Sequence, residues 1–297
     1  MSEPTSSRAN RSRLRIGNDV VDLEHPRCRT RPPDDRLPRR ILTSRERAWL
    51  EKAPDEPSRL RRLWSLWAAK ETAFKVVSKL RGSPPVFRHR AFRSDLSEER
   101  ESPDLVRLAG TVEWDPAQVD PGSSSDAEGH SASPPTVTVR VEGVATGEFV
   151  HLVGWNDTGD PHRPPCLEAG VEGRAPGSDG PLAESSRDPL PGPRRDPLSE
   201  RERRVASKRA RQVAQARLGS YLVRGREDGG PAPDITIRTS AARPGRTPPR
   251  VAVDGRLRPD LDLSLSHHGR YVGWAFLVPP EIRPSTPADD AGLSDQG

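Results

Sequence analysis

The chain has 297 residues with a net charge of +5, and only 32% of them are hydrophobic, while 33 are Pro and 24 are Gly. Segments this poor in apolar side chains do not offset the entropy lost on ordering, which excludes one continuous core. No stretch reaches about 18 apolar residues and the N-terminus lacks an apolar segment, so we expect no membrane span, no secretory signal and a cytoplasmic location. The positive balance favours phosphate-bearing or acidic partners.

Composition divides the chain into two apolar-bearing blocks, residues 14–156 and 198–278. Residues 157–197 between them are rich in Pro and Gly, which predicts a flexible linker without fixed structure. The same composition predicts disorder in residues 1–13, in an insert near 115–135 and in a tail over 279–297.

The first block is predicted to be α+β. Apolar residues recur at i, i+3, i+4 and i+7 over residues 60–78, which indicates a long helix. The other predicted elements are a strand over residues 16–23, a helix opened by a Thr43 and Glu46 capping box, and a hairpin over residues 136–141 and 148–155.

The second block is also predicted to be α+β and of similar size. A capping box at Ser199 and Glu202 indicates a helix of about 20 residues. Short strands are expected near Ile235 and Val251, followed by a hairpin that turns at residues 267–270 and ends with a strand over 271–278.

Glu71 lies within the apolar stripe of its own helix, four residues after Trp67 and three before Phe74. Its carboxylate is therefore expected to point toward a core, where it must be neutralised, paired or bound to a metal. Lys75, one turn later, is close enough to pair with it on the helix surface. The spacing leaves both the ion pair and the metal site open.

Asp19 stands among aliphatic residues in the predicted strand, on the face opposite Asp22. Asp is a poor strand former, so a functional role is favoured here. Asp19 and Glu71 together would supply the few oxygen ligands from which proteins hold Mg²⁺, with water and substrate phosphate filling the rest of its shell.

Ser266, His267 and His268 close one strand of the predicted C-terminal hairpin. Consecutive strand residues point to opposite faces, which argues against a zinc ion shared by the two His residues. A His with Arg270 beside a bound phosphate is physically reasonable, because both donate charge-assisted hydrogen bonds. A solvated turn is the alternative.

Three segments together resemble the signature segments of the 4'-phosphopantetheinyl transferase superfamily. They are Ile-Gly-Asn-Asp-Val-Val-Asp-Leu (16–23), Leu-Trp-Ala-Ala-Lys-Glu-Thr-Ala-Phe-Lys (66–75) and Leu-Ser-Leu-Ser-His-His-Gly-Arg-Tyr-Val (263–272). Their order is that of the small holo-acyl-carrier-protein synthases, and Thr43 to Glu46 is similar to the Leu-Thr-x-x-Glu element of those enzymes. The length of the chain is closer to the larger members, which fuse two similar halves.

The resemblance implies a Mg²⁺-dependent transferase that moves 4'-phosphopantetheine from coenzyme A to a serine of an apo acyl or peptidyl carrier protein. Adenosine 3',5'-bisphosphate would be released, and the pathway would be fatty acid or polyketide biosynthesis. The implied site has Mg²⁺ on Asp19 and Glu71, Glu71 and Lys75 as catalytic residues, and coenzyme A on Lys75, Ser266, His267 and Arg270. Either Glu71 or a water molecule would take the serine proton.

Three positions depart from the family pattern. Val21 stands where the larger members often place a third acid, Asn18 replaces an aliphatic residue, and His268 replaces Ser or Thr. Val21 implies that water completes the metal shell.

The resemblance also implies two similar half-domains in the reverse of the usual order, each a small antiparallel sheet packed with a long helix. Residues 14–156 would be the metal-binding half and residues 198–278 the half with the Ser-His pair. One site inside a monomeric pseudo-dimer is favoured, and a trimer is the alternative.

Two other functions compete with transfer. Clusters at Arg59-Arg61-Arg62 and Arg201-Arg203-Arg204 suggest nucleic-acid binding, but aromatic residues among them are sparse and no reader motif is present. A fold relative that has lost catalysis and acts as a binding module is the second rival, and the three intact segments argue against it.

Overall fold

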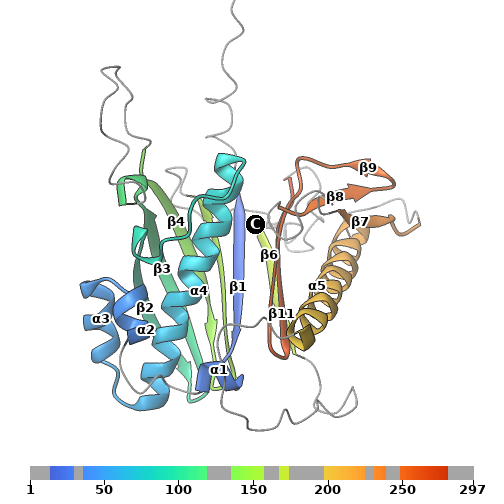
Figure 1. Ribbon diagram of the computed structural model, residues 1–297. Coiled ribbons are helices and arrows are strands. Elements are labelled where there is room, and N and C mark those ends of the chain that lie inside the picture. The colour runs from blue at the N-terminus through green and yellow to red at the C-terminus, as the bar shows by residue number, and fades with distance from the viewer. Residues whose placement is uncertain are drawn as a thin grey trace, which may run out of the picture.

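The structure of the protein is a computed structural model. It describes residues 14–29, 36–118, 135–156, 167–173, 197–224, 231–238 and 248–279, with the side chains of the 197–224 segment described from residue 204 onward. The elements form two groups that lie side by side (Figure 1). The predicted disordered segment 1–13 lies outside the described residues, as do most of the 115–135 insert, most of the 157–197 linker and all of the predicted 279–297 tail except residue 279.

The first group is a five-stranded antiparallel sheet with the strand order β1-β5-β4-β3-β2. Its strands are β1 (Ile16–Asp22), β2 (Phe92–Ser102), β3 (Leu105–Trp114), β4 (Val137–Ala145) and β5 (Phe149–Asn156). The long helix α4 (Glu56–Arg81) lies across one face of the sheet (Figure 1). The shorter elements are α1 (Pro26–Arg29), α2 (Arg36–Ile41), α3 (Ser44–Glu51) and two 3-10 turns, His89–Ala91 and Pro116–Gln118.

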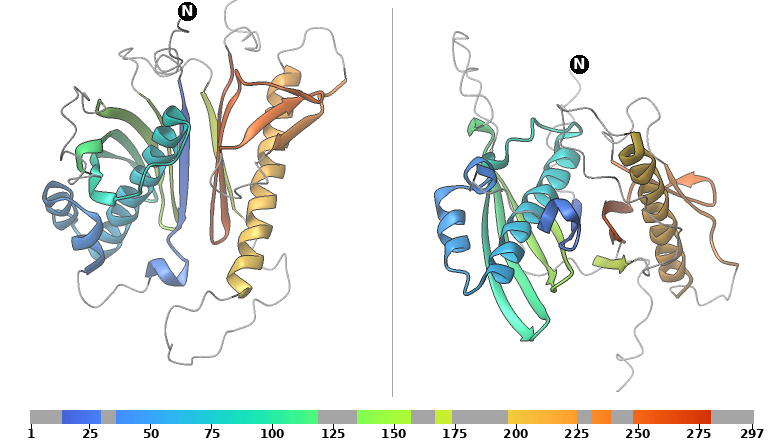
Figure 2. Two further views of the ribbon diagram at one scale, coloured as in Figure 1. Left: turned by 45° about the horizontal axis from the view of Figure 1, so that its top comes forward. Right: turned by 60° about the horizontal axis from the view of Figure 1, so that its bottom comes forward.

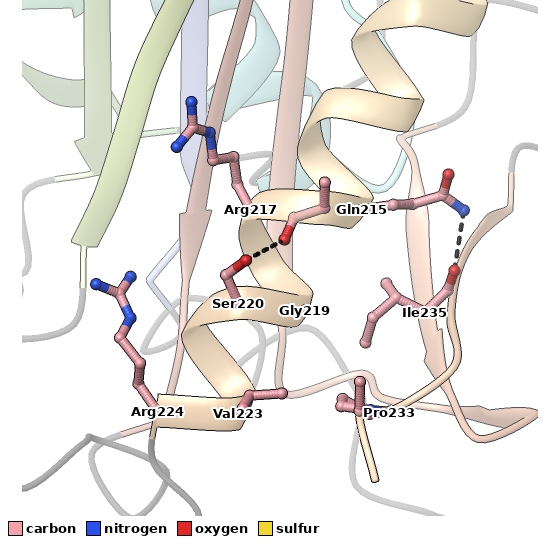
Figure 3. Close-up of a pocket in the computed structure, with 10 residues that line it drawn as sticks. Gln215, Arg217, Gly219, Ser220, Val223, Arg224, Pro233 and Ile235 are labelled. Atoms are coloured by element: carbon pink, nitrogen blue, oxygen red, sulfur yellow. Dashed lines mark hydrogen bonds between the residues drawn. The ribbon is translucent and has the colours of Figure 1, made fainter.

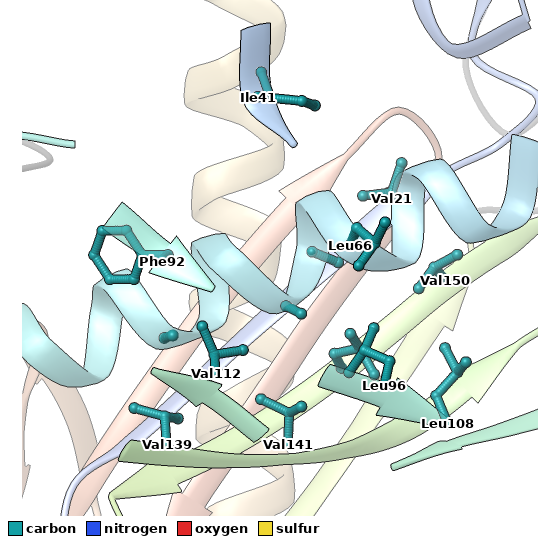
Figure 4. Close-up of a cluster of buried hydrophobic side chains, with 14 of the residues drawn as sticks. Val21, Ile41, Leu66, Phe92, Leu96, Leu108, Val112, Val139, Val141 and Val150 are labelled. Atoms are coloured by element: carbon teal, nitrogen blue, oxygen red, sulfur yellow. The ribbon is translucent and has the colours of Figure 1, made fainter. Parts of the chain in front are cut away.

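The main core lies between α4 and this sheet. Leu108, Val112, Val139 and Val141 come from alternating positions of β3 and β4, and they are fully buried against the helix that carries Leu66 (Figure 4). Each such side chain contributes about 1.5–3 kcal/mol on leaving water. This packing fixes α4, and every side chain on it, relative to the sheet.

Local sequence signals explain the helix ends. The Asp55 side chain accepts a hydrogen bond from the backbone N–H of Ser58 at 2.7 Å, and Gly82 ends α4 in the left-handed conformation with φ 71°. The Thr43 and Glu46 side chains each bond the backbone N–H of the other residue, as a capping box requires. Both predicted helices of the first block are therefore confirmed.

The second group contains two small sheets and a second long helix. One sheet has the order β10-β11-β6, and the other β7-β8-β9. The helix α5 (Pro197–Arg224) packs on β10 and β11. The strands are β6 (Leu167–Gly173), β7 (Ile235–Arg238), β8 (Arg250–Val253), β9 (Arg256–Leu257), β10 (Asp262–His268) and β11 (Tyr271–Leu277).

The prediction of an α+β fold with antiparallel sheets is confirmed, and three details differ. The linker prediction is wrong for residues 167–173, because they form β6 and pair with β11. The hairpin of β2 and β3 was not predicted. The helix α5 begins at Pro197, so Ser199 lies inside its first turn and not ahead of it.

The two groups meet along β1. Figures 1 and 2 show this blue strand at the edge of its own sheet, facing the red hairpin of β10 and β11. Ile16 and Val153 of the first group form a small apolar cluster with Ala275 and Leu277 of the second. None of the helices in the described ranges combines the length and the apolar character that crossing a bilayer requires.

Candidate functional site

Glycine at position 17 brings the two acidic segments together. A Cβ atom built on Gly17 would lie 2.2 Å from the backbone oxygen of Thr72, so only glycine allows β1 to approach α4 this closely. Asp19 follows Gly17 in β1, and Glu71 precedes Thr72 in α4. The negative charge of Asp19 raises the pKa of Glu71, so the two carboxylates are close enough to interact and belong to one site.

Lys75 joins this pair from the next turn of α4. Its Nζ donates to Asp19 Oδ1 at 3.0 Å and to the backbone oxygen of Asn18 at 2.6 Å. Lys75 therefore forms its ion pair with Asp19, and the helix-surface pair with Glu71 does not form. Within the described residues, the Glu71 carboxylate has no hydrogen-bond partner.

Burial makes both carboxylates unusually easy to protonate. Burial, and then the charge of Asp19, raises the pKa of Glu71 to about 7, while Lys75 opposes this shift. Burial also raises the pKa of Asp19, although Lys75 acts in the opposite direction. Two carboxylates that resist being charged together are a favourable place for a divalent cation.

The donor set fits Mg²⁺. Asp19 and Glu71 provide carboxylate oxygens, and Mg²⁺ is usually held by one or two carboxylates together with waters and substrate phosphate. Across the ranges that the structure describes, no cluster of three or more His, Cys, Asp or Glu residues could hold a metal. Val21, the position of a third acid in larger family members, is 3% exposed and belongs to the main core.

The Ser-His hairpin reaches the same strand through Asn18. The backbone N–H of Asn18 donates to Ser264 Oγ at 3.0 Å, and its side-chain Nδ2 donates to Ser266 Oγ at 3.0 Å. Ser266 is only 5% exposed. A Cβ atom on Gly273 would lie 2.6 Å from Ser266 Oγ, so glycine leaves room for this contact.

His268 and Arg270 lie at the other end of β1. His268 Nδ1 accepts from the backbone N–H of Asp22 at 2.9 Å, and burial, followed by the nearby His25, lowers the pKa of His268 to about 4. The Arg270 side chain donates to both Asp22 carboxylate oxygens at 3.2 Å. Burial alone would raise the pKa of Asp22, but the hydrogen bonds from Arg270 outweigh it and lower this pKa.

The structure thus brings Asp19, Glu71 and Lys75 into one cluster and links Ser266 to it through Asn18. His267 is half-buried on β10, next to Ser266. Arg270 is occupied by Asp22, so its predicted contact with a phosphate stays a prediction.

The sequence analysis missed His151 of β5. This residue is 5% exposed, and its Nε2 lies 3.4 Å from Asn18 Nδ2, the same atom that donates to Ser266. Burial, and then the charge of Lys75, lowers the pKa of His151 to about 4. The available signal was a single polar ring in the otherwise apolar run of residues 149–155.

Replacing His151 with Gln is expected to flatten the acid side of the stability profile. The unfolded chain takes up a proton near pH 6.5, whereas folded His151 stays neutral down to about pH 4, so stability falls as the pH drops through this window. The contribution of His151 approaches about 3 kcal/mol at the acid end. Urea unfolding at pH 7 and pH 4.5 measures it, and an identical pH dependence in variant and parent would contradict the buried neutral ring.

A groove of about 800 Å³ lies elsewhere, between the C-terminal turns of α5 and the segment before β7 (Figure 3). Gln215, Val223 and Ile235 line it. Arg217 at its rim is paired with Glu172. None of the predicted site residues lines this groove, so it is separate from the cluster around Glu71.

Comparison with known proteins gives a family match. The family model of the 4'-phosphopantetheinyl transferase superfamily matches residues 15–114, which confirms the resemblance over that part of the chain. The matched residues include Asp19, Glu71 and Lys75, while Ser266 and His267 lie beyond them. A search of curated proteins found no match. The family match supports phosphopantetheine transfer in general.

Proposed function

Because the family model of the 4'-phosphopantetheinyl transferase superfamily matches residues 15–114, we propose that this protein transfers 4'-phosphopantetheine from coenzyme A to a serine of an apo acyl or peptidyl carrier protein. The observation that carries the proposal is the meeting of Asp19, Glu71 and Lys75 where Gly17 lets β1 touch α4. The proposed type is a holo-acyl-carrier-protein synthase, and the proposed setting is the cytoplasm.

In the proposed reaction the serine Oγ forms a bond to the β-phosphorus of coenzyme A. The bond from that phosphorus to the oxygen bridging the α-phosphate breaks, and adenosine 3',5'-bisphosphate leaves. Phosphoryl transfer of this kind relies on positioning and on stabilising negative charge more than on covalent help from the protein.

Asp19 and Glu71 would hold Mg²⁺, which when bound supplies positive charge to the pyrophosphate. The Lys75 ammonium lies 3.0 Å from Asp19 Oδ1 and would neutralise a phosphate oxygen. Glu71 would take the serine proton directly or through a water, since a positioned carboxylate can serve as a general base. Ser266, His267 and Arg270 would bind the phosphates of coenzyme A from the other strand.

The proposal is tested by incubating purified protein with labelled coenzyme A and an apo carrier protein, with and without Mg²⁺. Attachment of the label to the carrier serine, lost when Mg²⁺ is removed, is the expected result. Binding of coenzyme A without transfer would overturn the proposal in favour of a binding module. Binding of nucleic acid but not coenzyme A would instead favour the nucleic-acid-binding alternative.

We also propose that the two groups of elements are related half-domains that complete one site inside a single chain. Each group combines an antiparallel sheet with one long helix, and Asn18 of one contacts Ser264 and Ser266 of the other.

A mixture of the inactive variants Glu71→Gln and His267→Ala is expected to stay inactive, because each chain lacks a residue of its own site. Dilution of the parent protein should leave its specific activity unchanged. Activity restored on mixing would show that the site is shared between chains, as in the trimeric alternative.

A further inference from the structure

The strand that carries Asp19 is held against the Ser-His strand by side chains. As an edge strand, β1 has backbone N–H groups that do not pair with β5. Three of these groups donate hydrogen bonds to side chains of β10. The pairs are Ile16 with Asp262 Oδ2 at 2.7 Å, Asn18 with Ser264 Oγ at 3.0 Å, and Asp22 with His268 Nδ1 at 2.9 Å. In each pair 246 residues separate donor from acceptor, so the strands run parallel in one fixed register.

Lys79 closes one end of this contact. Its Nζ donates to the backbone oxygen of Ile16 at 2.6 Å, to Asp262 Oδ1 at 3.1 Å and to the backbone oxygen of Leu263 at 2.8 Å. These contacts use all three protons of the ammonium group. Lys79 is 8% exposed and lies one turn beyond Lys75, so the helix that carries Glu71 and Lys75 also ties the two strands together.

The serines alone would not define this register. A slip by two residues would keep every side chain on its own face and would place Ser266 where Ser264 now meets Asn18, so a hydroxyl would still meet the same N–H. Asp262 is the only acid in β10, and only the observed register places it beside Lys79. A buried ion pair often adds little net stability, and its best-attested use is to select one register.

We infer that Lys79 is a positioning residue that fixes the register of β1 against β10, and with it the placement of Asp19 and Glu71 relative to Ser266 and His267. This inference rests on the proposed function for its catalytic consequence. The packing itself does not depend on that function.

The test compares Lys79→Met, the double variant Lys79→Met with Asp262→Leu, and the control Arg62→Met. Arg62 also lies on α4 and bonds the half-buried Glu98, but it touches neither β1 nor β10. Four quantities are measured for each protein: the free energy of unfolding, the exchange rates of single backbone amides, kcat/KM for transfer, and the dissociation constant of coenzyme A.

In Lys79→Met we expect faster exchange at all three covered amides of β1, those of Ile16, Asn18 and Asp22. We expect kcat/KM to fall by about 100-fold, because a misplacement of about 1 Å costs this much, and we expect weaker binding of coenzyme A. The double variant should recover unfolding free energy, since no unpaired buried charge remains, yet keep the catalytic defect. Arg62→Met should lower the free energy of unfolding but leave the affinity for coenzyme A unchanged.

Faster exchange confined to Ile16, or a double variant with normal kcat/KM, would overturn the inference and leave Lys79 with a purely structural role. Failure of the proposed function would show differently. The unmodified protein would then neither bind coenzyme A nor transfer the label, and the exchange rates would still decide whether Lys79 sets the register.

Discussion

Replacing Glu71 with Gln is expected to lower the rate of phosphopantetheine transfer by about 1,000-fold, within the range that a positioned acid or base supplies. The amide keeps the shape of the side chain but can neither hold a cation as a charged ligand nor accept a proton. Because Glu71 has no hydrogen-bond partner within the described residues, the change breaks no hydrogen bond there. Asp19→Asn should have a similar effect on activity.

The measurement is initial transfer rate over a Mg²⁺ titration, with thermal unfolding as the check on folding. Glu56→Gln is the matched control, since Glu56 lies in the first turn of the same helix with a side chain that is 58% exposed. It should leave both quantities near those of the parent. Near-parental turnover of Glu71→Gln at limiting Mg²⁺ would show that the metal site is wrongly assigned.

Replacing Lys70 with Met is expected to destabilise the protein by about 3–5 kcal/mol, the usual result of removing one partner from a buried ion pair. Lys70 is fully buried, and its Nζ donates to Glu46 Oε1 at 2.6 Å, to the His89 backbone oxygen at 3.1 Å and to the Phe92 backbone oxygen. The variant leaves the Glu46 carboxylate buried with only backbone N–H donors.

Urea unfolding gives the free energy directly. The control is Arg45→Met, which removes an ion pair to Asp95 whose two side chains are 78% and 61% exposed, so a loss below about 1 kcal/mol is expected. Equal losses in the two variants would contradict the role of Lys70 as the buried tie between α3, α4 and β2. Lys70 and Glu71 are neighbours in sequence, and the two experiments separate a structural residue from one that is proposed to be catalytic.

Much of the first block could be predicted from local patterns. The capping box at Thr43 and the apolar stripe around Glu71 depend on side chains within one or two turns, so a short window contains the whole signal. Glu71 lies among the partly buried residues of that stripe, whereas the fully buried face of α4 is formed by residues such as Leu66, Ala69 and Ala73.

Features that depend on distant partners could not be predicted in this way. The sequence of β6 has the composition of a linker, because most of its residues are small or charged. Its partner strand β11 lies about 100 residues later in the chain, so no local pattern indicates the pairing. His151 and Asn18 give no local sign that they meet. Their contact spans 133 residues and exists only because β1 pairs with β5.

The choice of partner for Lys75 shows the same limit at short range. Helical spacing favours Glu71, but the backbone contact between Gly17 and Thr72 brings Asp19 within 3.0 Å of the ammonium. Tertiary packing therefore decided between two partners that the sequence left open.

The position of β1 also governs how the chain can fold while it is being synthesised. This strand leaves the ribosome before its partners, because the residues that accept hydrogen bonds from its outer amides follow 246 residues later. During that interval the first sheet can form with an open edge, which is a template for pairing with other chains. A chain that stops before β10 therefore exposes the strand that carries Asp19 to aggregation, and completion of the second group protects the nascent sheet as well as adding the Ser-His half of the proposed site.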